Sequence, residues 1–168
     1  RIAVTLDAAH AEAVAERHAL GRRTARENLA DLLDEGSFNE FGPPAAGSVE
    51  GGTVMGIGTI NADKFGTEKG RCAFTVYDYM VLAGTQGQRH HRKLDRIFHL
   101  AKEWSIPVVL FAEGGGGRPG DTERATYAGI SSRTFTAFAE LSGEVPLVGV
   151  VSGRCFAGNA AFLGCCDV

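Results

Sequence analysis

The spacing of apolar and polar residues divides the chain into a helical beginning and a longer part where strands and helices alternate. Residues 7–20 are rich in Ala and Glu and predict a helix. A second helix begins at a capping box, because Thr24 can accept a hydrogen bond from the amide of Glu27 while the Glu27 side chain reaches back. An apolar stripe of leucines follows, and Gly36 predicts the end of this helix.

Residues 42–52 contain two prolines and two glycine clusters, which is typical of a loop. This loop separates the two predicted helices from the rest of the chain. We therefore expect two parts: residues 1–52 form a helical N-terminal arm with its loop, and residues 53–168 form the core of the fold.

The core pattern favours an α/β fold. Strands are predicted at residues 54–60, 72–77, 80–83, 107–111 and 146–151, of which the last two have the continuous apolar pattern of strands buried on both faces. Helices are predicted at residues 88–104, from Asp121 or Thr122 onward, and at 157–166. From about residue 72 the alternation indicates a parallel sheet with packed helices, in which ligands bind beyond the C-terminal ends of the strands.

Charge and composition exclude several classes of function. The net charge of −3 gives no electrostatic reason to expect nucleic acid or an anionic membrane as a partner. No apolar run approaches the ~20 residues that span a bilayer, and nothing resembles a signal peptide, so we expect a cytoplasmic protein.

No metal site is expected. The four cysteines form no C-x-x-C pair, and we expect Cys165 and Cys166 to be buried free thiols. The neighbouring His90 and His91 point apart on a helix, so we interpret them as surface residues.

Glycine is the one unusual component, with 23 residues, about twice the usual share of roughly 7%. Two predicted strands end in glycine-rich loops, at residues 113–121 and 153–159. If these strands are neighbours, backbone N–H groups from both loops converge and can form an oxyanion hole, with the second loop adding a helix N-terminus. The alternative is that each loop is a plain connector. A dinucleotide site is not favoured, since the G-x-G-x-x-G at 115–120 does not open a helix.

Four blocks of the sequence resemble the carboxyltransferase components of biotin-dependent acyl-CoA carboxylases, the acetyl- and propionyl-CoA carboxylase family. They are GRRTARENLADLLDEGSF (21–38), YDYMVLAGTQG (77–87), PVVLFAEGGGGRPGDT (107–122) and VSGRCFAGNAAF (151–162). The EGGGGRPGD form of the first loop is most similar to that of long single-chain carboxylases. Where the family usually has paired glycines in the second loop, this chain has Ala157-Gly158.

The resemblance implies a crotonase-like (ClpP/crotonase) α/β fold that binds acyl-CoA. A C-terminal carboxyltransferase domain, usually from another subunit, brings carboxybiotin from a biotin carrier domain that is loaded by a biotin carboxylase domain. We therefore expect a homo-oligomer with a split site. The family's first domain has helices still to come after residue 168, so the chain is expected to be a fragment truncated at its C-terminus.

The implied reaction transfers a carboxyl group from carboxybiotin to the α-carbon of an acyl-CoA. The thioester oxygen is expected to accept hydrogen bonds from the amides of Gly115 or Gly116 and of Gly158. Further substrate contacts are expected from Ala157 and Asn159 beside Gly158, from Arg118 in the first loop, and from Arg22, Arg23 and Arg26 toward the CoA phosphates. The alternative for the arginines is a solvated helix face.

Two other functions stay open. One is a different crotonase-class enzyme, such as a hydratase, isomerase or decarboxylase, which needs a side-chain acid or base; only Glu113 and Asp121 are placed to serve. The other is a non-catalytic segment of a larger carboxylase.

Overall fold

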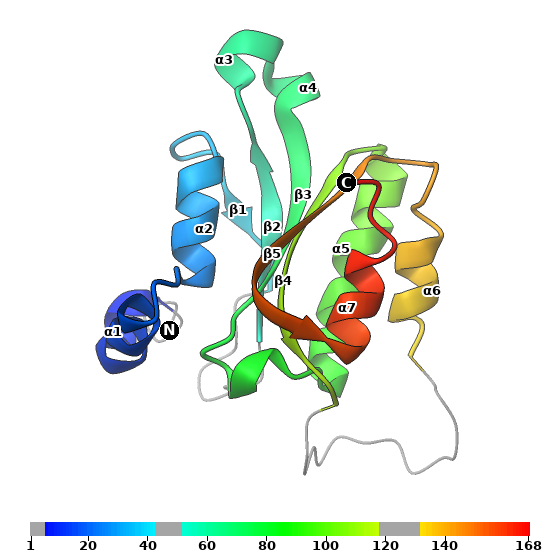
Figure 1. Cartoon of the computed structure of the whole chain (residues 1–168). Helices are drawn as coiled ribbons and strands as arrows, with labels where there is room; N and C mark the ends of the chain where they lie inside the picture. The colour runs from blue at the N-terminus through cyan, green and yellow to red at the C-terminus, as the bar shows by residue number, and fades with distance from the viewer. Residues whose placement is uncertain (1–5, 43–51, 118–131) are drawn as a thin grey trace.

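A mixed sheet of five strands runs through the centre of the molecule (Figure 1). The computed structural model describes residues 6–42, 52–117 and 132–168. In sheet order the strands are β1 (Asn39–Glu40), β2 (Thr53–Thr59), β3 (Arg71–Tyr77), β4 (Val108–Gly115) and β5 (Leu147–Phe156). The β1–β2 and β2–β3 pairs are antiparallel, whereas β3–β4 and β4–β5 are parallel. The predicted α/β class is confirmed, and its parallel part consists of β3, β4 and β5.

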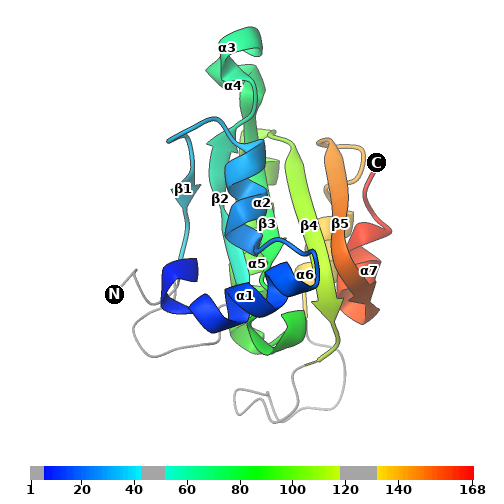
Figure 2. The same ribbon diagram turned by 60° about the vertical axis from the view of Figure 1, so that its left-hand side comes forward.

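Helices cover both faces of this sheet (Figure 2). The arm supplies the 3-10 helix η2 (Asp7–Ala9), α1 (Ala11–Ala19) and α2 (Ala25–Leu32), which lie on one face. The opposite face carries α5 (Gln88–Trp104), α6 (Thr134–Ala139) and α7 (Ala157–Leu163). The predicted capping box is present at the start of α2: the Thr24 hydroxyl accepts from the Glu27 amide, and the Glu27 side chain accepts from the Thr24 amide.

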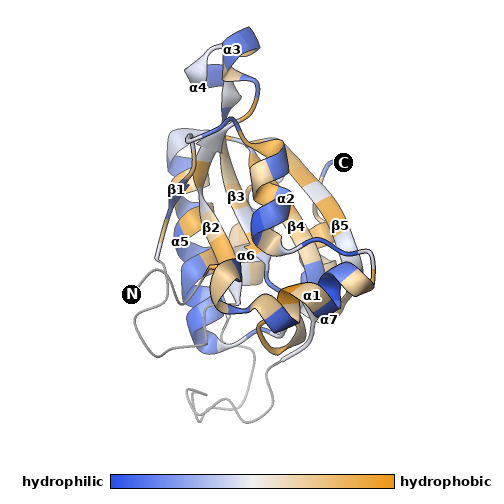
Figure 3. Cartoon of the chain, turned by 90° about the vertical axis from the view of Figure 1, so that its left-hand side faces the viewer, coloured by the Kyte–Doolittle hydropathy of each residue, from blue (hydrophilic) through white to orange (hydrophobic). Residues whose placement is uncertain are grey.

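The two apolar layers follow directly from the alternation of side chains along β3 and β4. On the arm side, Phe74, Val76, Val109 and Phe111 pack with Ala25 and Leu29 of α2. On the other side, Ala73, Val108, Leu110 and Ala112 pack with Leu94, Ile97 and Phe98 of α5. Figure 3 shows the apolar bands of the sheet behind α2. The arm is thus built into the core, although the boundary predicted at residue 52 stays a prediction because residues 43–51 are outside the described part.

The strand predicted at residues 80–83 is wrong. This segment is a turn with the 3-10 helix η4 (Leu82–Gly84), in which Leu82 and Ala83 have φ values of 48° and 54°. These left-handed values are incompatible with a strand, and the turn is needed to carry the chain from β3 to α5. The polar turn predicted between β2 and β3 contains two single-turn helices, α3 (Ala62–Phe65) and α4 (Thr67–Gly70), which project beyond the sheet (Figure 1).

Strand β5 was expected to be buried on both faces, and this is wrong. Val150 and Val151 point to opposite faces of the sheet and are 36% and 53% exposed, so the described residues leave this part of the edge strand uncovered on both faces. Trp104 was expected on the buried face of α5 but lies at its last residue and is 47% exposed. Cys165 is exposed rather than buried, since it follows the end of α7.

A helix was predicted from Asp121 or Thr122 onward, and the first part of that range lies outside the described residues. Within the described part, α6 begins at Thr134, and the predicted apolar positions Phe138 and Leu141 are fully buried. The long helix α5 has the predicted bounds, and four of its predicted apolar positions are buried, at Leu94, Ile97, Phe98 and Ala101.

We predict that Leu29→Ala lowers the free energy of unfolding by about 2–5 kcal/mol, because it leaves a cavity between α2 and the sheet. Leu29 is 3% exposed and packs among aromatic side chains of β3 and β4. Leu20→Ala is the matched control: Leu20 is 72% exposed, so the change should be within ~0.5 kcal/mol. Urea unfolding of both variants measures the difference. Equal losses would contradict the packing of the arm on the sheet.

Candidate active site at the ends of strands β4 and β5

The two glycine-rich loops lie side by side because β4 and β5 are parallel neighbours. Gly115 at the end of β4 pairs with Phe156 at the end of β5, one residue before α7. Gly115 has φ 149°, and a Cβ atom there would overlap the carbonyl oxygen of Phe156. Only glycine therefore permits this approach of the two backbones.

The residues predicted for the oxyanion hole are Gly115 and Gly116 at the end of β4 and Gly158 in the first turn of α7. Backbone N–H groups in the first turn of a helix have no partner within that helix, so the Gly158 amide is placed where it can donate outward. Ala157, which begins α7, has φ 51°. The structure thus brings these predicted residues to one edge of the sheet.

A bulge beside the first loop makes room for an acidic side chain. Ala112 pairs with Val151, but Gly114 pairs with Cys155, so β4 advances by two residues while β5 advances by four. The extra residues of β5 lie opposite Glu113. A Cβ atom at Gly153 would collide with the Glu113 carboxylate, so a glycine at this position is needed to seat it.

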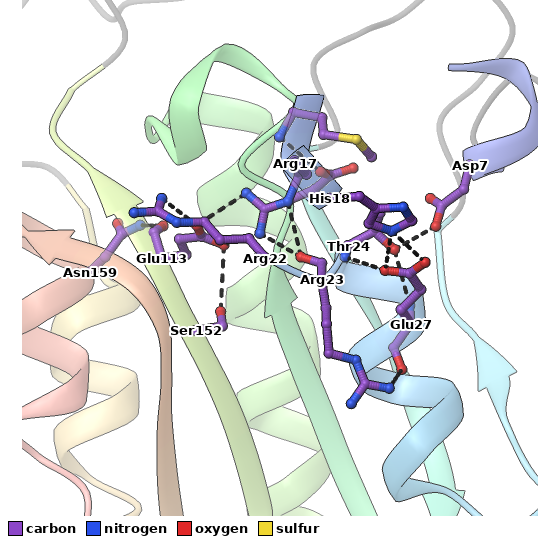
Figure 4. A network of polar contacts seen from close by, with 12 residues as sticks. Asp7, Arg17, His18, Arg22, Arg23, Thr24, Glu27, Glu113, Ser152 and Asn159 are labelled. Atoms are coloured by element: carbon purple, nitrogen blue, oxygen red, sulfur yellow. Dashed lines mark hydrogen bonds and ion pairs between the residues drawn. The ribbon is translucent and has the colours of Figure 1, made fainter. Parts of the chain in front are cut away.

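The carboxylate of Glu113 is buried in an ion pair with the arm (Figure 4). Glu113 follows Val109 and Phe111 on the arm-facing side of β4, and its side chain is 2% exposed. Two nitrogens of Arg17 contact its two oxygens at 2.8 and 3.1 Å, and Arg22 lies 3.5 Å away. Buried charges require such partners. Glu113 therefore anchors the arm to the sheet. The sequence left open a role for Glu113 as a general base, but in the structure its carboxylate is engaged by the guanidinium groups of Arg17 and Arg22.

Arg17 is itself held from several sides. Its Nε and Nη2 atoms donate to the carbonyl oxygen of Arg23 at 2.9 and 2.5 Å, and its guanidinium lies 5.5 Å from the centre of the Tyr79 ring. Sequence analysis did not single out Arg17. The sequence contained one signal for such a partner: Glu113 directly follows a predicted buried strand, so its charge requires a cation. The sequence does not identify which cation.

Asn159 is the second polar residue that joins the loops. Its side chain is fully buried, and its Nδ2 atom donates to the carbonyl oxygens of Glu113 and Gly84 at 2.8 and 3.1 Å. Its Oδ1 atom accepts from Nε2 of Gln86 at 2.7 Å. The side chain predicted to contact substrate thus binds the protein's own backbone. Gln86, which the sequence did not indicate, completes the group.

The three arginines of the arm, predicted as a cluster for CoA phosphates, each pair with a different carboxylate. Arg22 faces Glu113, and Arg23 pairs with Asp31 at 2.8 Å on the exposed surface of α2. Arg26 makes two contacts with Glu40, at 2.9 and 3.1 Å. Arg118 and Asp121 lie outside the described residues.

The interpretation of His90 as a surface residue is wrong. His90 is fully buried: its Nδ1 atom lies 2.8 Å from the Thr53 hydroxyl, and its ring lies 4.9 Å from that of Tyr77. The helical period places residue 90 on the same face as Leu94 and Ile97, a signal present in the sequence. His91 is partly buried, which lowers its pKa.

Burial also shifts the titration of two groups at this edge of the sheet. Lys93 donates from Nζ to the carbonyl oxygen of Thr53 at 2.6 Å, and burial lowers its pKa to about 8. Thr53 pairs with Tyr77, the last residue of β3. Asp78 follows, and burial raises its pKa against the opposing hydrogen bond from the Met80 amide.

Within residues 6–42, 52–117 and 132–168, no group of three or more His, Cys, Asp or Glu side chains could hold a metal ion. A search of the same residues finds no helix that is long and apolar enough to cross a membrane.

The model of the carboxyl transferase domain family matches residues 16–167. The chain belongs to this family. The matched span contains both glycine loops, Arg17 and Glu113, so the ion pair and the loops are part of a carboxyl transferase domain.

Relatives with known names agree with this assignment. The chain is 32% identical to the propionyl-CoA carboxylase beta chain of Saccharopolyspora erythraea, over 93% of this chain and 29% of that protein. It is also 32% identical to the methylmalonyl-CoA decarboxylase subunit alpha of Veillonella parvula, over 89% of this chain and 30% of that protein. The chain thus spans about 29% of the length of the first of these relatives.

Solved structures show the same fold. A single-chain, multi-domain long-chain acyl-CoA carboxylase matches with a TM-score of 0.90 and 52% identity, over 99% of this chain and 18% of that one. The transcarboxylase 12S subunit, solved as a hexamer with methylmalonyl-CoA and methylmalonic acid bound, matches with a TM-score of 0.74 and 28% identity, over 93% and 30%. The fold is crotonase-like, as the sequence indicated.

We predict that breaking the buried ion pair from either side costs about 3–5 kcal/mol of stability, because the remaining buried charge loses its main partner and, for Glu113, keeps only Arg22 at 3.5 Å. Arg17→Met and Glu113→Gln test the two sides, and the double variant should lose less than the sum of the single losses. Arg23→Met is the control: it removes an exposed pair but keeps the backbone oxygen that Arg17 uses, and it should have no measurable effect. Additive losses in denaturant unfolding would argue against the pair.

We predict a pH dependence from Lys93. Its pKa is about 8 in the folded protein against an ordinary value of 10.5, so between these values the unfolded chain binds more protons. The free energy of unfolding therefore rises with pH in this window, by at most about 1.4 kcal/mol per pH unit.

Urea unfolding of wild type and Lys93→Met at pH 7 to 10.5 isolates this contribution. The wild type should gain stability relative to the variant as pH rises above 8. The same comparison with the exposed Lys69, using Lys69→Met, should give a difference that does not change with pH. A constant difference for Lys93 would rule out the buried ammonium.

Proposed function

We propose that this chain forms the acyl-CoA-binding half of a biotin-dependent carboxyltransferase. In this proposal, backbone amides of Gly115 or Gly116 and of Gly158 donate to the thioester oxygen. They stabilise the negative charge that develops there when the α-proton leaves, and the α-carbon then forms a bond to CO₂. The observation that carries the proposal is the meeting of two glycine loops at the ends of parallel strands β4 and β5.

The surroundings of the loops support chemistry by backbone rather than by side chains. Among the described residues, Glu113 is the acid that immediately precedes the first loop, and two guanidinium groups already engage it. This favours an external base. Biotin, carboxylated on a separate carrier domain, supplies both the CO₂ and the base when it is bound.

We propose that the partners are a C-terminal carboxyltransferase domain, a biotin carrier and a biotin carboxylase domain, in a homo-oligomer that works in the cytoplasm. The names of the similar proteins support this: one is single-chain and multi-domain, and another is a hexamer with an acyl-CoA ligand. The cations that hold the CoA phosphates are proposed to come from Arg118 and the arm. Of Arg22, Arg23 and Arg26, it is Arg22 that faces Glu113 before the first glycine loop, at 3.5 Å.

Decarboxylation is the second candidate, favoured by the similarity to a methylmalonyl-CoA decarboxylase subunit. Loss of CO₂ from such a thioester leaves the same charge on the same oxygen, so the glycine loops would serve equally. Incubation of the complete protein with propionyl-CoA or with methylmalonyl-CoA separates the two. Net carboxylation of the first, with the carboxylated carrier domain as the CO₂ donor, supports the carboxylase direction, whereas loss of CO₂ from the second without carboxylation of the first supports decarboxylation.

We predict that Gly158→Pro in the complete protein lowers kcat on the order of 10²–10³-fold, the usual cost of one oxyanion donor. Gly158→Ala is the matched control. It introduces the same Cβ atom, which would lie 2.7 Å from Oε1 of Gln86, but it keeps the N–H group. The Pro variant should therefore be much less active than the Ala variant, with similar affinity for free CoA. Equal activities of the two variants would contradict the assignment of the Gly158 amide as an oxyanion donor.

A further inference from the structure

Two buried side-chain amides lie between the glycine loops. Asn159 is fully buried and Gln86 is 7% exposed. Burial of an amide is unfavourable unless its hydrogen bonds are made, and here they are made to the backbone of the loops and to each other. The two amides and the two loops therefore hold one another in place.

The first glycine loop is held at both ends by this pair. Nδ2 of Asn159 donates to the carbonyl oxygen of Glu113, the residue before Gly114, at 2.8 Å. The backbone N–H of Gln86 donates to the carbonyl oxygen of Gly116 at 2.8 Å. The segment between these carbonyls contains Gly115, one of the proposed donors.

The second loop is attached to the same pair. Asn159 directly follows Gly158 in α7, so the bond from its side chain to Glu113 spans the gap between the two loops. Nε2 of Gln86 holds Oδ1 of Asn159 at 2.7 Å and also donates to the hydroxyl of the buried Tyr77 at 3.1 Å. The hydrogen-bonded pair of Asn159 and Gln86 is therefore attached to the core of the sheet through Tyr77.

We propose that Asn159 and Gln86 are positioning residues that set the separation of the two groups of oxyanion amides. This rests on the proposed function. Such groups must be held within about 0.5 Å of the productive geometry, and a misplacement of about 1 Å can cost 10²-fold in rate. The pair acts through Gly115, Gly116 and Gly158 and does not itself contact the thioester.

The test is Asn159→Asp in the complete protein. The new side chain has the same shape but, when ionised, donates no hydrogen bond and faces two carbonyl oxygens. We expect kcat to fall by about 10- to 100-fold, while the KM for acyl-CoA and the Kd for free CoA change by less than ~3-fold. Asn39→Asp, at an exposed position of β1, makes the same change of charge and should leave kcat unchanged.

A second readout does not depend on activity. Hydrogen exchange of the amides in residues 113–117 and 156–160 should become faster in Asn159→Asp and stay unchanged in Asn39→Asp. If Asn159→Asp does not fold, Gln86→Met replaces it, because this variant keeps the backbone bond to Gly116 but releases Asn159; it should show the same effects more weakly.

The outcomes are distinct. A folded Asn159→Asp variant with wild-type kcat and unchanged exchange overturns the inference. A rise in the KM for acyl-CoA without a fall in kcat also overturns it, since this would make Asn159 a ligand contact. The wild-type protein could neither carboxylate nor decarboxylate any acyl-CoA, while hydrogen exchange of both loops still becomes faster in Asn159→Asp. In that case the link between the loops stands and the proposed function is wrong.

Discussion

The structure depends on one buried carboxylate. Glu113 lies at the end of the apolar strand β4, where the first glycine loop begins. Its charge is balanced mainly by Arg17 of α1, with Arg22 at 3.5 Å. The pair fixes the arm against the sheet edge at the site of the proposed chemistry. It also determines the bulge in β5, because Gly153 must leave space for the acid. Without Arg17, the buried charge at the end of β4 would keep only the more distant Arg22 as a cationic partner, which is more costly than a missing surface contact.

Around this anchor the molecule uses polar side chains to place backbone rather than to react. Glu113 binds Arg17, Asn159 binds two carbonyl oxygens, and Gln86 binds Asn159. Each is buried, and each has its partners inside the protein. What remains at the edge of the sheet is a row of glycines. This arrangement suits a reaction in which the protein stabilises charge on a thioester oxygen and the base arrives with another component.

The arm therefore has a closer relation to the proposed site than its place in the sequence suggests. Its helix α2 completes one apolar layer of the sheet, and its helix α1 carries the cation that Glu113 requires. Three of its arginines pair with carboxylates of the arm or the sheet edge. The arginines in the described part of the arm thus pair with carboxylates of the domain itself.

Local patterns in the sequence were enough to predict the capping box of α2, the bounds of α5, the strands β3 and β4, and the two glycine loops, because each depends on residues a few positions apart. The similarity of four sequence blocks indicated the family. Only the tertiary structure decided the rest. Arg17 and Glu113 are 96 residues apart, and Asn159 and Gln86 are 73 apart, so no local period relates them. The same is true of the errors. The segment η4 replaced a strand because the chain must turn there, and Val150 and Val151 of β5 are exposed because the described elements leave this part of the edge strand uncovered on both faces. Which buried polar group meets which partner is decided by packing at long range, and that information is not contained in any single segment.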